Sequence, residues 1–161
     1  MARFGIVNST TEISDTLNVN TTTVGNIGSG EDDLTTYLVP ANTLAVDGDS
    51  ITFEACGIFS ASANNKQLRA YFGTDVIFDS GVLAITAATE WIMTGRIIRT
   101  GSATQRVYIT LVTDNTTLFT MTNVLATTRT LSIDNPLKLT GEATNNDEVR
   151  QFSMIVSFNP I

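Results

Sequence analysis

The stretch that decides the fold reads SITFEACGIF, from residue 50 to residue 59. Along one of its faces, the positions are mostly apolar: Ile51, Phe53, Ala55 and Phe59. The opposite face carries a mixed set: Thr52, Glu54, Cys56 and Ile58. Because successive side chains of an extended chain point to opposite sides, this alternation predicts a β-strand that buries one face.

The same alternation recurs on both sides of this stretch. Extended segments are predicted at residues 34–39, 68–72, 90–99, 105–113 and 149–158, with shorter ones between them. Turn residues such as Asp47-Gly48-Asp49 and Thr100-Gly101-Ser102 separate them. Short strands at a spacing of about 8–12 residues are typical of a sandwich or barrel. The sequence therefore predicts an all-β, antiparallel β-sandwich of roughly nine or ten strands.

The chain divides into an N-terminal arm, residues 1–20, and a single β-sandwich domain, residues 21–161. The arm has few aligned apolar positions, and its Thr, Ser and Asp residues favour loops. It contains a small apolar cluster next to an arginine: Arg3, Phe4, Ile6 and Val7. A polar tract separates this cluster from the sandwich, so these four residues are the predicted contact to a partner. The alternative is an edge strand of this domain or of a neighbouring subunit.

Several predicted strands carry apolar side chains on both faces. One long strand has Trp91, Met93 and Ile97 on one face and Ile92 and Ile98 on the other. The first face can pack against the opposite sheet, but the second needs another cover, because an exposed apolar sheet face is costly. A loop, the N-terminal arm or a neighbouring subunit would provide that cover. The pattern therefore favours an oligomer.

Two local expectations concern a turn and a thiol. Asp79-Ser80-Gly81 favours a hairpin between residues 75–78 and 82–85. Cys56 is the only cysteine, so no internal disulfide forms. Its place in a strand predicts a buried thiol that packs as a small hydrophobe.

The composition excludes several kinds of site. The chain has no histidine, which rules out Ser-His and Cys-His nucleophile systems and, with one cysteine, structural zinc. We predict no catalytic residues, no bound metal and no cofactor. The strongest candidates for a glycosidase pair are Glu54, Glu90, Asp75 and Asp79, and nothing in the pattern places them in a cleft. The acidic runs Asp47-Gly48-Asp49 and Glu31-Asp32-Asp33 suit calcium, but solvated turns explain them more simply.

Charge and hydropathy bear on the partners. The net charge is −7, and only two lysines and seven scattered arginines are present, which argues against nucleic acid. No apolar run reaches the length of a membrane span, so no membrane partner is expected. Among the aromatic residues, Trp91 is expected in the core. Tyr37, Tyr71 and Tyr108 are expected at a subunit interface or, alternatively, in a sugar-binding platform.

Several turn-and-strand motifs resemble those of small virion proteins of tailed bacteriophages. The residues concerned are Val24-Gly25-Asn26 with Gly28 and Gly30, Leu38-Val39-Pro40-Ala41-Asn42-Thr43-Leu44 with Asp47-Gly48-Asp49, Ala63-Asn64-Asn65-Lys66 with Tyr71-Phe72-Gly73, and Ile98-Arg99-Thr100-Gly101. The resemblance covers roughly residues 24–110. It includes no catalytic residues.

The resemblance implies a jelly-roll or related β-sandwich that forms a homotrimer. Proteins of this kind serve as capsid cement (decoration) proteins, head fibres or tail-fibre domains. We therefore expect a capsid decoration protein, made in the host bacterial cytoplasm and located on the capsid surface of the virion. Its expected partners are further copies of itself and the major capsid protein. The short chain favours this role over the alternative, a receptor- or carbohydrate-binding module of a tail fibre or head fibre.

Overall fold

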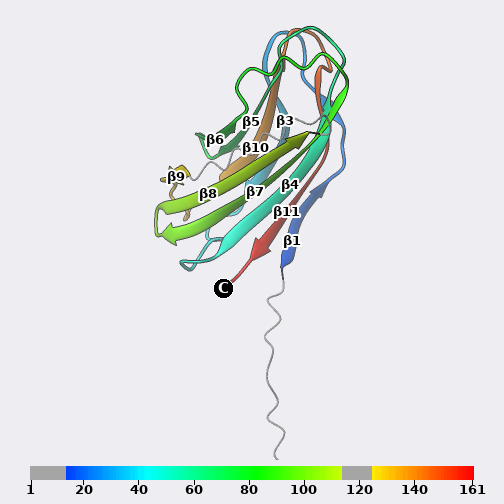
Figure 1. Ribbon diagram of the computed structural model, residues 1–161. Helices are drawn as coiled ribbons and strands as arrows, with labels where there is room; N and C mark the ends of the chain where they lie inside the picture. The colour runs from blue at the N-terminus through cyan, green and yellow to red at the C-terminus, as the bar shows by residue number, and fades with distance from the viewer. Residues whose placement is uncertain (1–13, 114–124) are drawn as a thin grey trace, which may run out of the picture.

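The computed structural model describes residues 14–113 and 125–161, which form two antiparallel sheets packed face to face (Figure 1). Every regular element in these two ranges is a β-strand, which confirms the all-β prediction. Within the same ranges, no helix is long and apolar enough to cross a membrane. The predicted partner contact, Arg3, Phe4, Ile6 and Val7, lies outside the described residues.

The larger sheet has the strand order β1-β11-β4-β7-β8-β9, and the short strand β2 also pairs with β11. Its strands are β1 (Asp15–Asn20), β2 (Val24–Gly25), β4 (Ser50–Phe59), β7 (Thr89–Gly101), β8 (Thr104–Thr113), β9 (Leu125–Thr127) and β11 (Val149–Asn159). The long strands β11, β4, β7 and β8 pair along most of their length and form a broad platform.

The smaller sheet covers one face of this platform (Figure 1). Its order is β3-β10-β5-β6. The strands are β3 (Gly30–Val39), β10 (Asn135–Ala143), β5 (Gln67–Phe72) and β6 (Asp75–Asp79). The chain passes repeatedly from one sheet to the other, for example from β3 to β4 and from β10 to β11, as in antiparallel sandwiches.

The core lies between the two sheets and consists of their inward-facing side chains. Trp91, Met93 and Ile97 of β7 are at most 1% exposed, as the alternation predicts. Phe59 of β4 packs against Trp91, with the ring centroids 6.2 Å apart. The smaller sheet contributes Leu68, Ala70, Phe72, Leu137 and Leu139. Burial of each large apolar side chain contributes roughly 1.5–3 kcal/mol, so this layer is the main source of stability.

Strand β1 changes the boundary of the N-terminal arm. The sequence places residues 15–20 in the arm, but they pair with β11, from Asp15 opposite Phe158 to Asn20 opposite Met154. The edge of β11 offers unpaired backbone groups, and a strand with weak alternation can still satisfy them. For residues 15–20 the edge-strand alternative is therefore the correct one.

The hairpin expected across Asp79-Ser80-Gly81 is wrong. Strand β6 pairs instead with β5, across a turn in which Gly73 has a φ of +62°. The hydroxyl of Ser80 accepts the backbone N–H of Leu68 at 3.0 Å, which ends the ladder with a side chain. Leu83 then forms an isolated bridge with Lys66.

Lys66 fixes the loops at one end of the sandwich. Its side chain is buried. The ammonium group donates hydrogen bonds to the backbone carbonyl oxygens of Ser62, Asn64 and Ile85, at 3.2, 3.0 and 2.9 Å. A buried charge is tolerated only with such partners, so this lysine is a structural clamp between loops.

Candidate interaction face

The outer face of the seven-stranded sheet is the side turned away from the four-stranded sheet. The strand register determines which side chains it carries. Glu54 of β4 lies beside Thr94 of β7 and Ile155 of β11, and Ile155 lies beside Val19 of β1. The face therefore extends across β1, β11, β4, β7 and β8, with alternate residues pointing outward.

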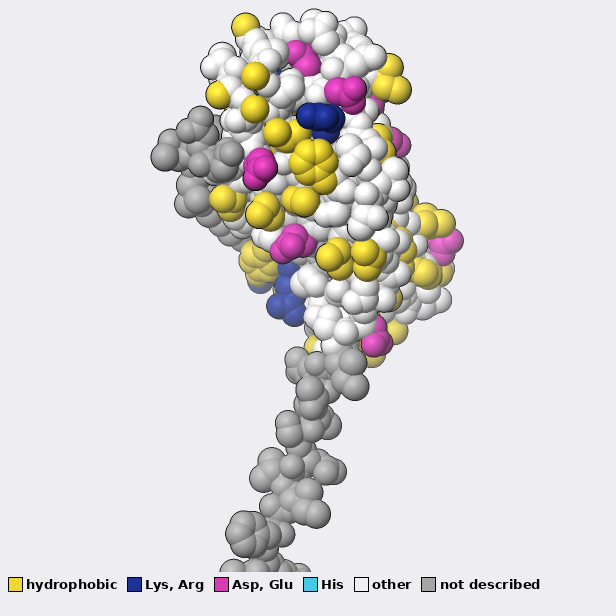
Figure 2. Space-filling model, turned by 90° about the vertical axis from the view of Figure 1, so that its right-hand side faces the viewer, with side chains coloured by type: hydrophobic (Ala, Val, Ile, Leu, Met, Phe, Trp, Pro, Cys, Tyr) yellow, Lys and Arg dark blue, Asp and Glu magenta, His cyan; other side chains and the backbone are white. Residues whose placement is uncertain are grey.

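One half of the outer face is apolar. We define the apolar strip by the residues Val19, Ile58, Ile92, Val112, Phe152 and Ile155. The exposed fraction is 59% for Val19, 49% for Ile92, 41% for Ile155 and 37% for Val112. Figure 2 shows hydrophobic side chains gathered on this side of the molecule, with single acidic side chains among them. The solvated face of an antiparallel sheet is normally polar, so the strip is a candidate interaction surface.

The apolar strip contains a hollow of about 410 Å³, bordered by Cys56, Glu90, Ile92, Val112 and Phe152. Cys56 is half-buried here, and its sulfur shares a hydrogen bond with the hydroxyl of Ser153 at 3.2 Å. The prediction of a core thiol is therefore wrong. Cys56 belongs to the mixed face of β4, and the strand alternation turns that face away from the core.

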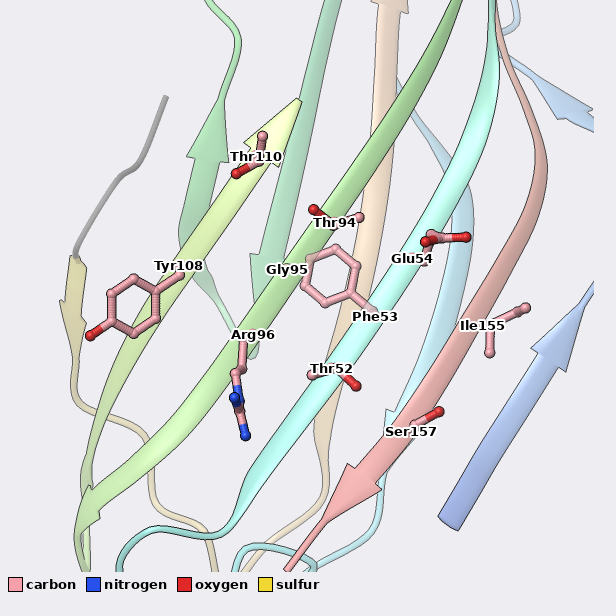
Figure 3. A pocket seen from close by; sticks show the side chains of 10 residues that line it. All are labelled: Thr52, Phe53, Glu54, Thr94, Gly95, Arg96, Tyr108, Thr110, Ile155 and Ser157. Atoms are coloured by element: carbon pink, nitrogen blue, oxygen red, sulfur yellow. The ribbon is translucent and has the colours of Figure 1, made fainter. Parts of the chain in front are cut away.

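The other half of the outer face holds an open groove of about 460 Å³, the polar groove (Figure 3). Gly95 of β7 and the ring of Phe53 lie at its base. Adding a side chain to Gly95 would bring its Cβ within 2.2 Å of the Phe53 ring, so only glycine fits there. The surrounding side chains are Thr52, Glu54, Thr94, Arg96, Tyr108, Thr110, Ile155 and Ser157.

The charges on the outer face have no ion-pair partners among the described residues. The charged side chains are Glu54, Glu90, Arg96, Arg106 and Arg150, and none belongs to an ion pair in the ranges that the structure describes. Three positive and two negative charges give this face +1, while the chain carries −7, so the rest of the chain carries −8. The outer face is thus the non-acidic side of an acidic protein.

The outer face of the four-stranded sheet has the opposite organisation. Arg69 of β5 pairs with Glu31 at 2.9 Å, Glu142 at 2.8 Å and Asp79 at 3.2 Å. The hydroxyl of Tyr71 donates a hydrogen bond to Glu31 at 2.5 Å. We call these five residues the Arg69 network. It connects all four strands, so the polar groups of this face are satisfied within the chain.

The Arg69 network shifts the pKa values of its members. Burial raises the pKa of Glu31, but hydrogen bonds from Thr140 and Tyr71 and the charge of Arg69 outweigh it and hold that pKa below 4.5. Burial and the hydrogen bond to Glu31 raise the pKa of Tyr71 to about 12. Burial also raises the pKa of Asp79, but hydrogen bonds from Gln67, Gly81 and Arg69 bring it below 3.8.

The carboxylates considered for a glycosidase are not brought together. Glu54 pairs in register with Thr94, whereas Glu90 pairs with Ile58, four residues farther along β4. Four residues of strand correspond to about 13 Å, more than the roughly 5–9.5 Å between the carboxyl groups of a glycosidase. Asp75 and Asp79 lie on β6, in the other sheet.

The acidic runs considered for calcium are occupied by protein partners. The carboxylate of Asp49 accepts the backbone N–H groups of Ala45 and Val46, at 2.9 and 2.8 Å. In the other run, Glu31 belongs to the Arg69 network and Asp33 pairs with Lys138 at 2.9 Å. Both runs therefore serve to hold the fold.

The aromatic residues do not form one platform. Trp91 is in the core, as predicted. Tyr37 and Tyr71 lie in the four-stranded sheet, and only Tyr108 borders the polar groove. Sequence reasoning missed the groove, although one signal was present: Gly95 interrupts a strand otherwise rich in large side chains, and such a glycine indicates close packing from a neighbour.

No protein-family model, no curated protein and no solved structure matches the chain. Any functional conclusion therefore depends on the two outer faces and on the residues of the chain itself.

Proposed function

We propose that the protein is a structural component of a bacteriophage particle, a homotrimeric decoration protein of jelly-roll type that binds the shell and stabilises it. The apolar strip is the observation that carries this proposal. Four of its aliphatic side chains are more than a third exposed on a strand face where polar residues are normally found. A contact that covers the strip would gain about 1 kcal/mol for each of these half-exposed side chains.

The distribution of charge supports another copy of the chain as the partner that covers the apolar strip. A cyclic trimer brings one patch of each subunit against a different patch of its neighbour. The outer face carries +1 and the remainder of the chain −8, so Arg150, which pairs in register with Ile58 of the apolar strip, would meet an acidic surface. Complementary charges of this kind orient an interface whose affinity comes from apolar burial.

Attachment to the shell is assigned to the N-terminal arm, on the evidence of the sequence. The apolar cluster Phe4, Ile6 and Val7 stands next to Arg3 and precedes β1, which begins at Asp15. Each buried apolar side chain would contribute roughly 1.5–3 kcal/mol before the cost of ordering the arm. Three arms on one trimer would reinforce one another through avidity. The partner in this proposal is the major capsid protein.

Electron microscopy of phage particles with and without the protein tests this function. We expect added density at three-fold positions of the shell when the protein is present, and its loss with Phe4→Ser, Ile6→Ser and Val7→Ser combined. The matched control replaces the polar neighbours of the cluster, Ser9→Ala with Thr10→Ala, and should still decorate the shell. Shells that look the same with and without the protein would refute the decoration role.

A further inference from the structure

The polar groove suggests a second activity, separate from assembly. We propose that the polar groove binds a neutral saccharide. The groove adjoins the apolar strip at Ile155 and extends away from it along β7 and β8 toward Arg96 and Tyr108 (Figure 3). Its volume, about 460 Å³, is in the range of small-ligand sites of roughly 300–1,000 Å³.

The groove offers hydrogen-bonding groups of both kinds, as a sugar requires. Each hydroxyl of a saccharide both donates and accepts, so its site needs acceptors and donors side by side. Glu54 supplies a carboxylate that makes no hydrogen bond or ion pair among the described interactions. Arg96 supplies a guanidinium, and Thr94 of β7 and Thr110 of β8 supply hydroxyls.

The groove is held in place before any ligand binds. Nε and Nη2 of Arg96 donate to the hydroxyl of Ser50 at 3.1 and 3.0 Å, which leaves Nη1 for a ligand. The amide of Asn159 donates to the hydroxyl of Thr52 at 3.1 Å. These groups stand on paired strands, so little conformational entropy is lost when a ligand binds.

Tyr108 supplies the apolar part of the site. Its side chain is half-buried at one side of the groove, opposite the Glu54 side (Figure 3). The C–H face of a sugar ring packs on an aromatic ring, while the hydroxyls at its rim reach polar groups. Tyr108 therefore stands on one side of the groove and Glu54 on the other.

The same lining disfavours other ligands. Glu54 and Arg96 give it a formal charge of zero, so a phosphate or a nucleotide would gain no net attraction and would face the carboxylate. A single carboxylate beside a guanidinium is a poor site for a divalent cation. The threonine and serine hydroxyls would remain unsatisfied against a lipid chain. A neutral saccharide satisfies all of these groups.

A glycan array probed with the full-length protein tests the proposal. The array carries neutral glycans alongside glycans that contain sialic or uronic acids. We expect binding to one or more neutral glycans, and a loss of roughly tenfold or more for Glu54→Gln and for Tyr108→Ala. Glu90→Gln is the matched control, because Glu90 is also an exposed carboxylate on this face but does not line the groove. It should bind as the unchanged protein does.

A second measurement covers the case in which a variant is unstable. The amide resonances of Thr94, Gly95 and Thr110 in the unchanged protein should shift when the best neutral glycan is added, while those of the four-stranded sheet should not. The proposal is overturned if no neutral glycan binds, if only acidic glycans bind, or if Glu54→Gln and Tyr108→Ala bind normally. Shifts confined to residues outside the groove would also overturn it.

Discussion

The two outer faces of the sandwich differ in how their charged side chains are partnered. Both are built by strands whose other side faces the core, and both carry charged side chains. On the four-stranded sheet, Arg69 joins three carboxylates into one network. On the seven-stranded sheet, the charges have no ion-pair partners among the described residues, and apolar side chains such as Ile92 and Ile155 stand half-exposed between them.

This difference indicates which face is meant for solvent. A face whose polar groups are satisfied within the chain needs nothing else and gains little from a partner. Leu38 and Val76 are exposed on the four-stranded sheet, but they lie on its opposite edge strands, β3 and β6. The apolar strip lies on neighbouring strands and gains from being covered. We therefore propose that the interface is the apolar strip of the seven-stranded sheet, and that the four-stranded sheet faces solvent.

The largest expected effect is on the oligomeric state, and it comes from placing a charge on each outer face in turn. Ile155→Asp should convert the trimer to monomers, because an unpaired carboxylate would be buried in the interface. Val76→Asp is the matched control, since Val76 is 43% exposed on the four-stranded sheet and Ile155 is 41% exposed on the other. Analytical ultracentrifugation reports the mass of both variants. Two trimeric variants, or two monomeric ones, would contradict the comparison.

The second effect concerns the contribution of the Arg69 network to the free energy of unfolding. Arg69→Met leaves Glu31, Asp79 and Glu142 without their cation and should lower the free energy of unfolding by about 2 kcal/mol, since the groups are partly exposed to solvent. Arg106→Met removes an arginine without an ion pair and should change it by less than about 0.5 kcal/mol. Urea unfolding in the monomeric Ile155→Asp background separates this effect from assembly. Equal losses would show that the two faces do not differ in their internal pairing.

A related, smaller effect appears with pH. The pKa values of Glu31 and Asp79 are lowered from 4.5 and 3.8, so both carboxylates stabilise the fold above those ordinary values. That contribution is lost as the pH falls through their lowered pKa values. The melting temperature should therefore fall more steeply in acid for the unchanged network than for Arg69→Met. Parallel curves for the two proteins would rule out the network as the cause.

The alternation of apolar residues predicted the core but not the pairing of the edge strands. Trp91, Met93 and Ile97 are buried because their order in the strand determines the face they take, and that order is visible in the sequence. Residues 15–20 were misplaced because edge pairing depends on the free side of β11, which no local pattern reports. The prediction of a hairpin between residues 75–78 and 82–85 was wrong because β6 pairs with β5, and the Ser80 hydroxyl accepts the backbone N–H of Leu68 at the end of that pairing.

For the two outer faces, too, the sequence predicts only what a local pattern reports. The alternation correctly placed Ile92 on the outer face, where it is 49% exposed, because apolar residues at alternate positions are a local signal. The Arg69 network depends instead on strand order: Arg69 meets Glu142, 73 residues away, because β5 lies beside β10. The polar groove likewise arises from four neighbouring strands, so its residues could be grouped only in three dimensions.

The smallest effect uses Cys56 as a probe of the apolar strip. Its thiol is half-buried beside Ile92 and Val112, so a covering subunit should slow its reaction with a thiol reagent. We expect faster labelling in the monomeric Ile155→Asp variant than in the unchanged protein, with Val76→Asp labelling at the unchanged rate. The same rate in all three proteins would mean that nothing covers the strip.

The mass of the unchanged protein in solution tests the central claim most directly. Light scattering at micromolar concentration should give three times the chain mass of 17.3 kDa, because the apolar strip of each subunit is covered by another copy. A mass of 17.3 kDa at every concentration measured would contradict the claim that this face is covered by the protein itself.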